Sequence, residues 1–216
     1  MPPNDDLIKF YDGFLPRLST ENARHRRIYQ SLDTLPKGKA LDIGCGAGLT
    51  SHRLAEGGRE VVAIDFSPAA IEFAKRNRGH ERIQYICADI SEFKTREFFD
   101  AICLVDVLEH LDNATQYDVF RIISTTARHD AVVYVNVPYS ETIRYLEKNH
   151  PDALQPIDRP LDIGWVIEEF DMRGFVPFRM ELFWMQYVEL FLCRKEQFKA
   201  HMDHAFQSLK RSNDNG

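Results

Sequence analysis

Three alternate glycines follow a short apolar run near residue 40 and could bind a small ligand. The run is Lys39–Ile43, the glycines are Gly44, Gly46 and Gly48, and the helix-like stretch 49–55 comes next. Glycine adopts positive φ angles and lets a ligand approach the backbone without a Cβ in the way. The first turn of the following helix would offer free N–H groups and a partial positive charge to a carboxylate or phosphate. The pattern predicts a ligand cradle between a strand and a helix.

Carboxylates follow two further apolar runs at positions suited to a nucleoside ligand. Asp65 follows the run Glu60–Ile64, at the distance from the glycines where a carboxylate can accept two ribose hydroxyls. Asp89 follows the run Ile83–Cys87. In an open parallel sheet such residues meet, because ligands bind beyond the carboxyl ends of the strands. The alternative for Asp65 is a helix cap, although Ser67 already supplies one.

The spacing of the glycines distinguishes between two families of proteins that bind nucleotide-like ligands. Dinucleotide-binding folds use G-x-G-x-x-G, but Leu49 stands at the third glycine position here. With Asp42 two residues before the first glycine, the spacing Asp42-x-Gly44-x-Gly46-x-Gly48 resembles motif I of the class I S-adenosylmethionine-dependent methyltransferases. Val105-Asp106-Val107-Leu108-Glu109-His110-Leu111 resembles the V-L-E-H-L signature of the branch that includes ubiquinone-biosynthesis O-methyltransferases. The resemblance covers about residues 39–137.

The resemblance implies S-adenosyl-L-methionine as cofactor and S-adenosyl-L-homocysteine as product. It implies methyl transfer to an oxygen or nitrogen of a small-molecule acceptor. In the family, an Asp after the third strand takes the adenine amino hydrogen and the N–H of the next residue meets a ring nitrogen, which would be Asp89 and Ile90 here. The residues expected to bind the cofactor are Tyr11, Arg24, Asp42, Gly44, Gly46, Gly48, Asp65, Phe66, Asp89, Ile90 and Val105.

For three side chains the sequence leaves two roles open. His110 is the candidate catalytic base, because imidazole titrates near neutrality, but it could also only shape the site. Arg24 could pair with the methionine carboxylate, since a guanidinium suits bidentate carboxylate binding, or it could be a surface helix residue like Arg26 and Arg27. Tyr11 could cover the cofactor or pack in the core or a lid.

Apolar runs and helical periodicity alternate along the chain, which predicts a parallel sheet covered on both faces. The resemblance adds a reversed terminal strand, so the expected fold is α/β, a doubly wound and mostly parallel seven-stranded sheet. Expected strands are 39–43, 60–64, 83–87, 100–105, 131–137, 175–182 and 186–193. Expected helices include those from Ser67, from 113 to 128 and from 162 to 173.

We expect one domain, 1–216, in four functional segments. Residues 1–35 would form a helical cap broken at Pro16, with a second helix from Thr20 to Leu32, and 36–137 the cofactor-binding core. The polar stretch 138–161 reads as a lid or substrate segment, since loops of that length are commonly functional. A terminal helix and hairpin follow over 162–194, and then a helix with Phe198, Met202 and Phe206 on one face.

Composition limits the possible partners. The formal net charge of −6 argues against a large nucleic-acid surface, which needs clustered Lys and Arg. No membrane span or secretory signal is visible, so we expect a cytoplasmic protein. The four cysteines, Cys45, Cys87, Cys103 and Cys193, read as buried thiols in a reducing compartment. His201 and His204 lack the partners of a zinc site, so no metal is expected.

Other functions stay open at this level. An RNA or protein methyltransferase could use Arg24–Arg27 as a docking patch, and a non-catalytic cofactor-binding module could keep the same motifs. A NAD-dependent enzyme is disfavoured by Leu49. Asn136-Val137-Pro138-Tyr139 looks like the N-P-P-Y box of nucleic-acid amino-methyltransferases, but it follows the fifth predicted strand instead of the fourth, and reads as a strand end. The acceptor and the oligomeric state are not set by any motif.

Overall fold

The computed structural model describes residues 5–18 and 20–214. The strands are β1 (Lys39–Ile43), β2 (Glu60–Asp65), β3 (Ile83–Cys87), β4 (Phe99–Val105), β5 (Ala127–Pro138), β6 (Phe175–Phe183) and β7 (Tyr187–Arg194). The helices are α1 (Asp5–Leu18), α2 (Ala23–Asp33), α3 (Leu49–Glu56), α4 (Pro68–Asn77), α5 (Asn113–Thr126), α6 (Ser140–Asn149), α7 (Ile163–Met172) and α8 (Lys195–Asp214), with one-turn 3-10 helices at Leu108–His110 and Pro151–Ala153.

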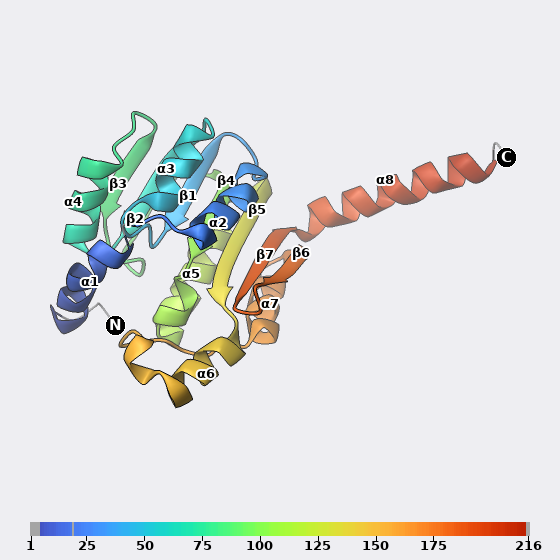
Figure 1. Cartoon of the computed structure of the whole chain (residues 1–216). Coiled ribbons are helices and arrows are strands. Elements are labelled where there is room, and N and C mark those ends of the chain that lie inside the picture. Colours follow the sequence, from blue (N-terminus) through green and yellow to red (C-terminus); the bar gives the residue numbers. More distant parts are fainter. Residues whose placement is uncertain (1–4, 19, 215–216) are drawn as a thin grey trace.

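All seven strands belong to one sheet in the order β3-β2-β1-β4-β5-β7-β6 (Figure 1). Strands β1 to β5 are parallel, and β7 runs antiparallel to both β5 and β6. The predicted fold class, with its reversed terminal strand, is therefore confirmed. The strand order reverses between β1 and β4, and this is the point where an open parallel sheet binds ligands.

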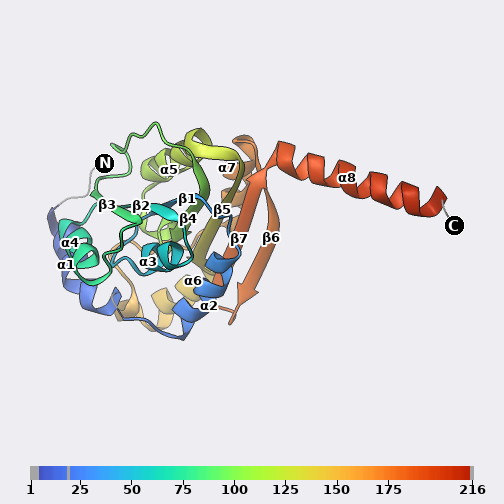
Figure 2. The same ribbon diagram turned by 90° about the horizontal axis from the view of Figure 1, so that it is seen from above.

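Helices cover both faces of the sheet, as the near-continuous apolar strands require. Helices α5 and α7 pack on one face through side chains such as Phe120 and Phe170, while α2 and α3 pack on the other through Leu32 and Leu54 (Figure 2). The carboxyl ends of the parallel strands point toward the end of the molecule where α1 and α6 lie (Figure 1). These two helices can therefore cover a ligand at that end.

The N-terminal region differs from the sequence prediction at its helix boundaries. Helix α1 continues past Pro16 to Leu18, so the predicted break is wrong, because Pro16 falls in the last turn and removes only one helical hydrogen bond there. Helix α2 begins at Ala23 instead of Thr20, because Asn22 caps it by accepting from the amide of His25. Residues 1–4 and 19 of the predicted cap lie outside the described residues.

Three other regions also depart from the prediction. The stretch 138–161 is not a plain loop but contains α6, an amphipathic helix whose apolar side chains include the buried Ile143. The sequence shows this helical periodicity, which the prediction overlooks. Strand β5 begins at Ala127 and bulges before pairing again at Val132. Cys87 is exposed, contrary to prediction, because β3 is an edge strand.

The C-terminal helix α8 is present as predicted and projects away from the body of the molecule (Figures 1 and 2). Its apolar side chains Phe198, Met202 and Phe206 are exposed. Among the residues described, no helix is both long and apolar enough to cross a bilayer.

Arg59 fixes the end of α2 against the sheet. Its side chain is fully buried and donates to three backbone carbonyls, those of Leu32, Leu35 and Pro36. Carbonyls at a helix C-terminus have no partner within the helix, so a cation there satisfies them and matches the helix dipole. Because Arg24 lies on the same helix, this anchor also positions a predicted site residue.

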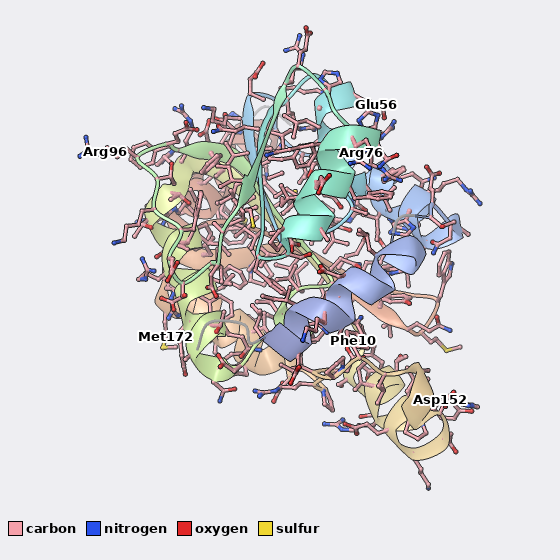
Figure 3. All side chains as sticks on the ribbon, turned by 90° about the vertical axis from the view of Figure 1, so that its left-hand side faces the viewer. Phe10, Glu56, Arg76, Arg96, Asp152 and Met172 are labelled. Atoms are coloured by element: carbon pink, nitrogen blue, oxygen red, sulfur yellow. The ribbon has the colours of Figure 1, made fainter. Side chains whose placement is uncertain are left out.

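Replacing Arg59 with Ala should destabilise the protein by about 2–4 kcal/mol, because it removes three hydrogen bonds from a buried cation to carbonyls at the end of α2 and in the turn after it. Urea unfolding followed by circular dichroism measures the change. Arg76→Ala is the matched control, since Arg76 lies on the exposed face of α4 (Figure 3) and should change stability by less than about 0.5 kcal/mol. Equal effects of the two substitutions would show that Arg59 is not an anchor.

Candidate functional site

A cavity of about 500 Å³ lies at the carboxyl ends of β1, β2 and β4. Its walls come from α1 and α2, the glycine loop, the loops after β2, β3 and β4, α6, and the segment that follows α6. Of the residues predicted from the sequence, those that line it are Tyr11, Arg24, Gly44, Gly46, Asp65, Phe66, Asp89, Ile90, Val105 and His110. Asp42 and Gly48 do not line it.

The three glycines of the loop have different roles. All have positive φ, at 69° for Gly44, 48° for Gly46 and 82° for Gly48. A Cβ on Gly44 would lie 2.7 Å from a methyl of Val107, and one on Gly48 would lie 2.6 Å from the hydroxyl of Tyr85. A Cβ on Gly46 would meet nothing within 4 Å. Gly44 and Gly48 are therefore required by packing, whereas Gly46 leaves open space on the cavity side.

Asp65 joins the glycine loop to the start of α4. One carboxylate oxygen accepts from the Gly46 amide at 2.8 Å and the other from the Ser67 amide at 2.9 Å. Burial raises the pKa of Asp65, and these amide hydrogen bonds oppose the rise. Helix α4 has its own cap, because the Ser67 hydroxyl accepts from the Ala70 amide. Asp65 is thus more than a helix cap, and each oxygen keeps a lone pair for a ligand hydroxyl.

Asp42 has a supporting position instead of the direct contact expected from the sequence. Its side chain is only 1% exposed and accepts a hydrogen bond from the Ser51 hydroxyl on α3. Burial raises the pKa of Asp42 to about 7, with the Ser51 hydrogen bond opposing the rise. It therefore fixes the helix that follows the glycine loop.

Arg24 is held by an ion pair that the sequence did not reveal. Both terminal nitrogens donate to the carboxylate of Asp106, and Nη2 also donates to Asn136. The guanidinium stacks 3.9 Å from the centre of the Tyr187 ring. Much of its hydrogen-bonding capacity is thus used within the protein, which leaves less for a methionine carboxylate. The predicted contact with the cofactor stays a prediction.

The basic stretch at Arg24–Arg27 does not form an exposed docking patch. Arg24 is 14% exposed and paired with Asp106, and Arg27 forms ion pairs with Glu181 and Glu189. Arg26, with a side chain 66% exposed, is the arginine of this stretch that reaches solvent. These pairs weigh against the nucleic-acid alternative.

His110 is held in place by contacts with the segment that follows α6. Its Nδ1 lies 2.7 Å from the carbonyl oxygen of Ile157 and 3.0 Å from a carboxylate oxygen of Asp158. Because a carbonyl can only accept, Nδ1 carries a proton and donates. The amide nitrogen of Gln155 lies 3.3 Å from Nε2. None of these three partners was identified from the sequence, because they lie 45 to 48 residues away in a segment without a motif.

The charge state of His110 differs from the expectation of a group titrating near neutrality. Burial acts to lower the pKa of His110, but Glu109, Asp158 and the Ile157 carbonyl outweigh it and raise the pKa to about 9. A pKa of about 9 favours the imidazolium form of the ring at neutral pH. In that form Nε2 also donates, so the Gln155 amide, whose oxygen has no partner among the described residues, would turn this oxygen toward the ring. The Tyr11 ring meets it edge-on, with ring centres 6.3 Å apart.

The raised pKa of His110 predicts a pH-dependent contribution to stability. A folded-state pKa of about 9, above the usual value of about 6.5, means that His110 stabilises fully below pH 6.5 and that this gain is lost as pH rises through 9. The difference in unfolding free energy between the wild type and His110→Gln should therefore shrink by on the order of 1–3 kcal/mol from pH 6 to pH 9.5.

Denaturant unfolding at several pH values measures this difference. His129→Gln, at an exposed position of β5, controls for loss of an imidazole elsewhere on the surface. If the difference between the wild type and His110→Gln stayed constant across this range, His110 would not be held as an imidazolium.

The chain resembles known proteins both in the sequence of its core and in its fold. Residues 40–130 match the family model described as a methyltransferase domain. The ubiquinone biosynthesis O-methyltransferase of Bradyrhizobium sp. (strain ORS 278) is 39% identical over 90 residues, covering 41% of this chain and 36% of the relative. Nodulation protein S of Sinorhizobium fredii is 31% identical over 118 residues, 53% of this chain and 55% of the relative. The chain thus spans about a third to a half of the length of these relatives.

A solved structure extends the likeness beyond the matched core. The N-methyltransferase NodS from Bradyrhizobium japonicum WM9, in complex with S-adenosyl-L-homocysteine, superposes with a TM-score of 0.71 at 18% identity, covering 88% of this chain and 99% of that one. The shared fold therefore extends beyond residues 40–130, the range that the family model matches.

Proposed function

We propose that this chain, which carries the core of a class I S-adenosylmethionine-dependent methyltransferase, transfers a methyl group to an oxygen or nitrogen of a small-molecule acceptor. The observation that carries the proposal is the cavity at the carboxyl ends of β1, β2 and β4, where the open Gly46 position and the carboxylate of Asp65 lie together. Gly46 and Asp65 fall within residues 40–130, the part of the chain that matches the methyltransferase domain.

The residues around the cavity fit S-adenosylmethionine. Asp65 would accept the ribose hydroxyls, and Gly44 and Gly46 would let the amino-acid part approach the backbone. Asp89 and Ile90, after β3, would meet the adenine ring, with Phe66 and Val105 beside it. Arg24 would face the methionine carboxylate while held by Asp106. Apart from Arg24, these residues fall within residues 40–130, which match the methyltransferase domain. All of them, Arg24 included, line the cavity.

The bound sulfonium would supply an electrophilic methyl group, so the protein mainly has to align an acceptor and exclude water. Tyr11 from α1 and Ile143 and Leu146 from α6 line the cavity and would form its cover. A volume of about 500 Å³ lies in the range of small-molecule sites. A macromolecular acceptor is disfavoured by the paired arginines of α2 and the net charge of −6.

The relatives support two acceptor atoms. The relative from Bradyrhizobium sp. (strain ORS 278) is named as an O-methyltransferase, and the NodS structure is named as an N-methyltransferase. Both oxygen and nitrogen therefore belong to the proposed function. The identity of the acceptor lies beyond what these relatives support, since the chain covers only part of their length.

Cofactor binding tests the proposal directly. S-adenosyl-L-homocysteine should bind at micromolar concentration in isothermal titration calorimetry, and NAD should not. Asp65→Ala should weaken this binding by about 1.5–3 kcal/mol, the range for hydrogen bonds to a charged group. The control is Asp152→Ala, because Asp152 lies at the far tip of the α6 segment (Figure 3). Binding of NAD without S-adenosyl-L-homocysteine would overturn the proposed function.

Closure of the cavity is a second test. If α1, α2 and the α6 segment close over the cofactor, amide hydrogen exchange should slow in residues 5–18, 20–30 and 139–161 when S-adenosyl-L-homocysteine is added. Residues 195–206 of α8 project away from the body and provide the internal control, with no expected change. Identical exchange with and without ligand in the covering segments would exclude a moving lid.

A further inference from the structure

Glu109 is a buried carboxyl group without a hydrogen-bond partner. It lies in the one-turn helix after β4, and its backbone carbonyl accepts from the amide of Arg159 at 3.1 Å. The residue is 1% exposed, and neither carboxylate oxygen has a partner among the described residues. Burial raises the pKa of Glu109 to about 8, with His110 opposing the rise. Buried polar groups without a hydrogen-bond partner are rare, because burying them without one costs free energy.

The surroundings of Glu109 belong to the cavity. His110 Nε2 lies 3.8 Å from one carboxylate oxygen. Burial chiefly raises the pKa of Tyr11 and of Tyr187, and the Glu109 charge raises both further. Tyr11, Tyr187 and His110 come from α1, β7 and the turn after β4, and all three line the cavity with Glu109. Glu109 therefore belongs to the wall of the cavity, next to side chains that an enclosed ligand would meet.

His110 has less capacity than Glu109 to accept a proton from a ligand. Its Nδ1 donates to the carbonyl of Ile157 beside Asp158, and the Gln155 amide faces its Nε2. Among the described residues at this end of the cavity, the oxygens without a partner include those of Glu109 and Oε1 of Gln155. Of these two side chains, the carboxyl group is the one that can take up a proton.

We propose that Glu109 is the catalytic residue that accepts the hydrogen bond and the proton of the methyl acceptor, and that this acceptor is an amine. The inference rests on the proposed methyl transfer and names the acceptor class of that same site. It assigns His110 to a different task, which is to hold a positive charge beside Glu109.

The charges that line the cavity favour an ammonium group over a carboxylate. The carboxyl side chains in the lining outnumber the basic ones. They are Asp65, Asp89, Asp106, Glu109, Asp112 and Asp158, against Arg24, His25 and His110. Arg24 and His110 are already paired with Asp106 and Asp158. A carboxylate acceptor would meet like charges, whereas a cation is attracted and lowers the pKa of Glu109 toward its ionised form.

The proton and electron balance is simple. The acceptor ammonium gives one proton to the Glu109 carboxylate, which frees the nitrogen lone pair. That lone pair forms the N–C bond as the C–S bond of the sulfonium breaks with its electrons onto sulfur. The products are a methylated ammonium and S-adenosyl-L-homocysteine, and Glu109 releases its proton to solvent when the site opens.

A ligand pair tests the inference without an identified acceptor. In sinefungin a carbon replaces the sulfonium sulfur and bears a primary amine in the place of the methyl group. S-adenosyl-L-homocysteine has no group at the position of the methyl. Calorimetry should show that the wild type prefers sinefungin. In Glu109→Gln, sinefungin affinity should fall by about 10- to 100-fold, the effect of losing a charged hydrogen bond, with S-adenosyl-L-homocysteine affinity changed by less than about threefold.

Two further variants serve as controls, one for misfolding and one for the loss of a surface charge. Glu109→Asp keeps the carboxylate and should retain part of the preference, and Glu147→Gln, on the exposed side of α6, should retain all of it. No preference for sinefungin in the wild type would overturn the amine acceptor. A preference that persists in Glu109→Gln would overturn the role of Glu109. Failure of the wild type to bind S-adenosyl-L-homocysteine would instead overturn the proposed function.

Discussion

The carboxylate of Asp65 holds together the two loops from which the cavity is built. It accepts one amide from the glycine loop after β1 and one from the start of α4 after β2. The glycine loop is also fixed by the amides of Gly44 and Cys45, which both donate to the carbonyl of Ile64. These bonds exist only because β1 and β2 are parallel neighbours in register. The position of the open Gly46 backbone follows from this arrangement.

On the other side of the switch in strand order, a second group of polar contacts joins α2, β4 and β5. Asp106 has a φ of 55°, unusual for a residue other than glycine, and it turns its carboxylate toward Arg24. Asn136, at the end of β5, accepts from the same guanidinium. Strain of this kind persists where the surroundings determine the conformation, and it is concentrated at functional sites. The sheet thus presents a ligand loop on one side of the switch and a charged wall on the other.

The parts of this protein that could be predicted from the sequence are those determined by local patterns. Strand β1, the Ser67 cap and the hairpin β6–β7 follow from apolar runs, turn residues and spacing. The partners of the site residues could not be predicted in this way. Arg24 meets Asp106 and Asn136 across 82 and 112 residues, and His110 meets Ile157 across 47. Such pairs depend on tertiary packing, which a single sequence does not encode as a local signal.

The same distinction applies to Glu109 and Asp42, whose surroundings the sequence did not reveal. Both are acidic residues in family-like motifs, but one is buried beside the cavity without a partner and the other is turned away toward Ser51. A motif gives the residue type and position along the chain, whereas the direction of the side chain depends on the neighbouring elements. For Glu109 that neighbour is the segment after α6, since the amide of Arg159 fixes its backbone.

The segment after α6 therefore links the cover of the cavity to the charges inside it. Ile157 and Asp158 supply the contacts that keep His110 protonated, and they belong to the stretch expected to move when the cavity opens. If this stretch moves away, His110 loses two of the contacts that raise its pKa, while exposure to water removes the burial that lowers it. Opening of the cavity therefore changes the surroundings of the charge beside Glu109 through one segment of the chain.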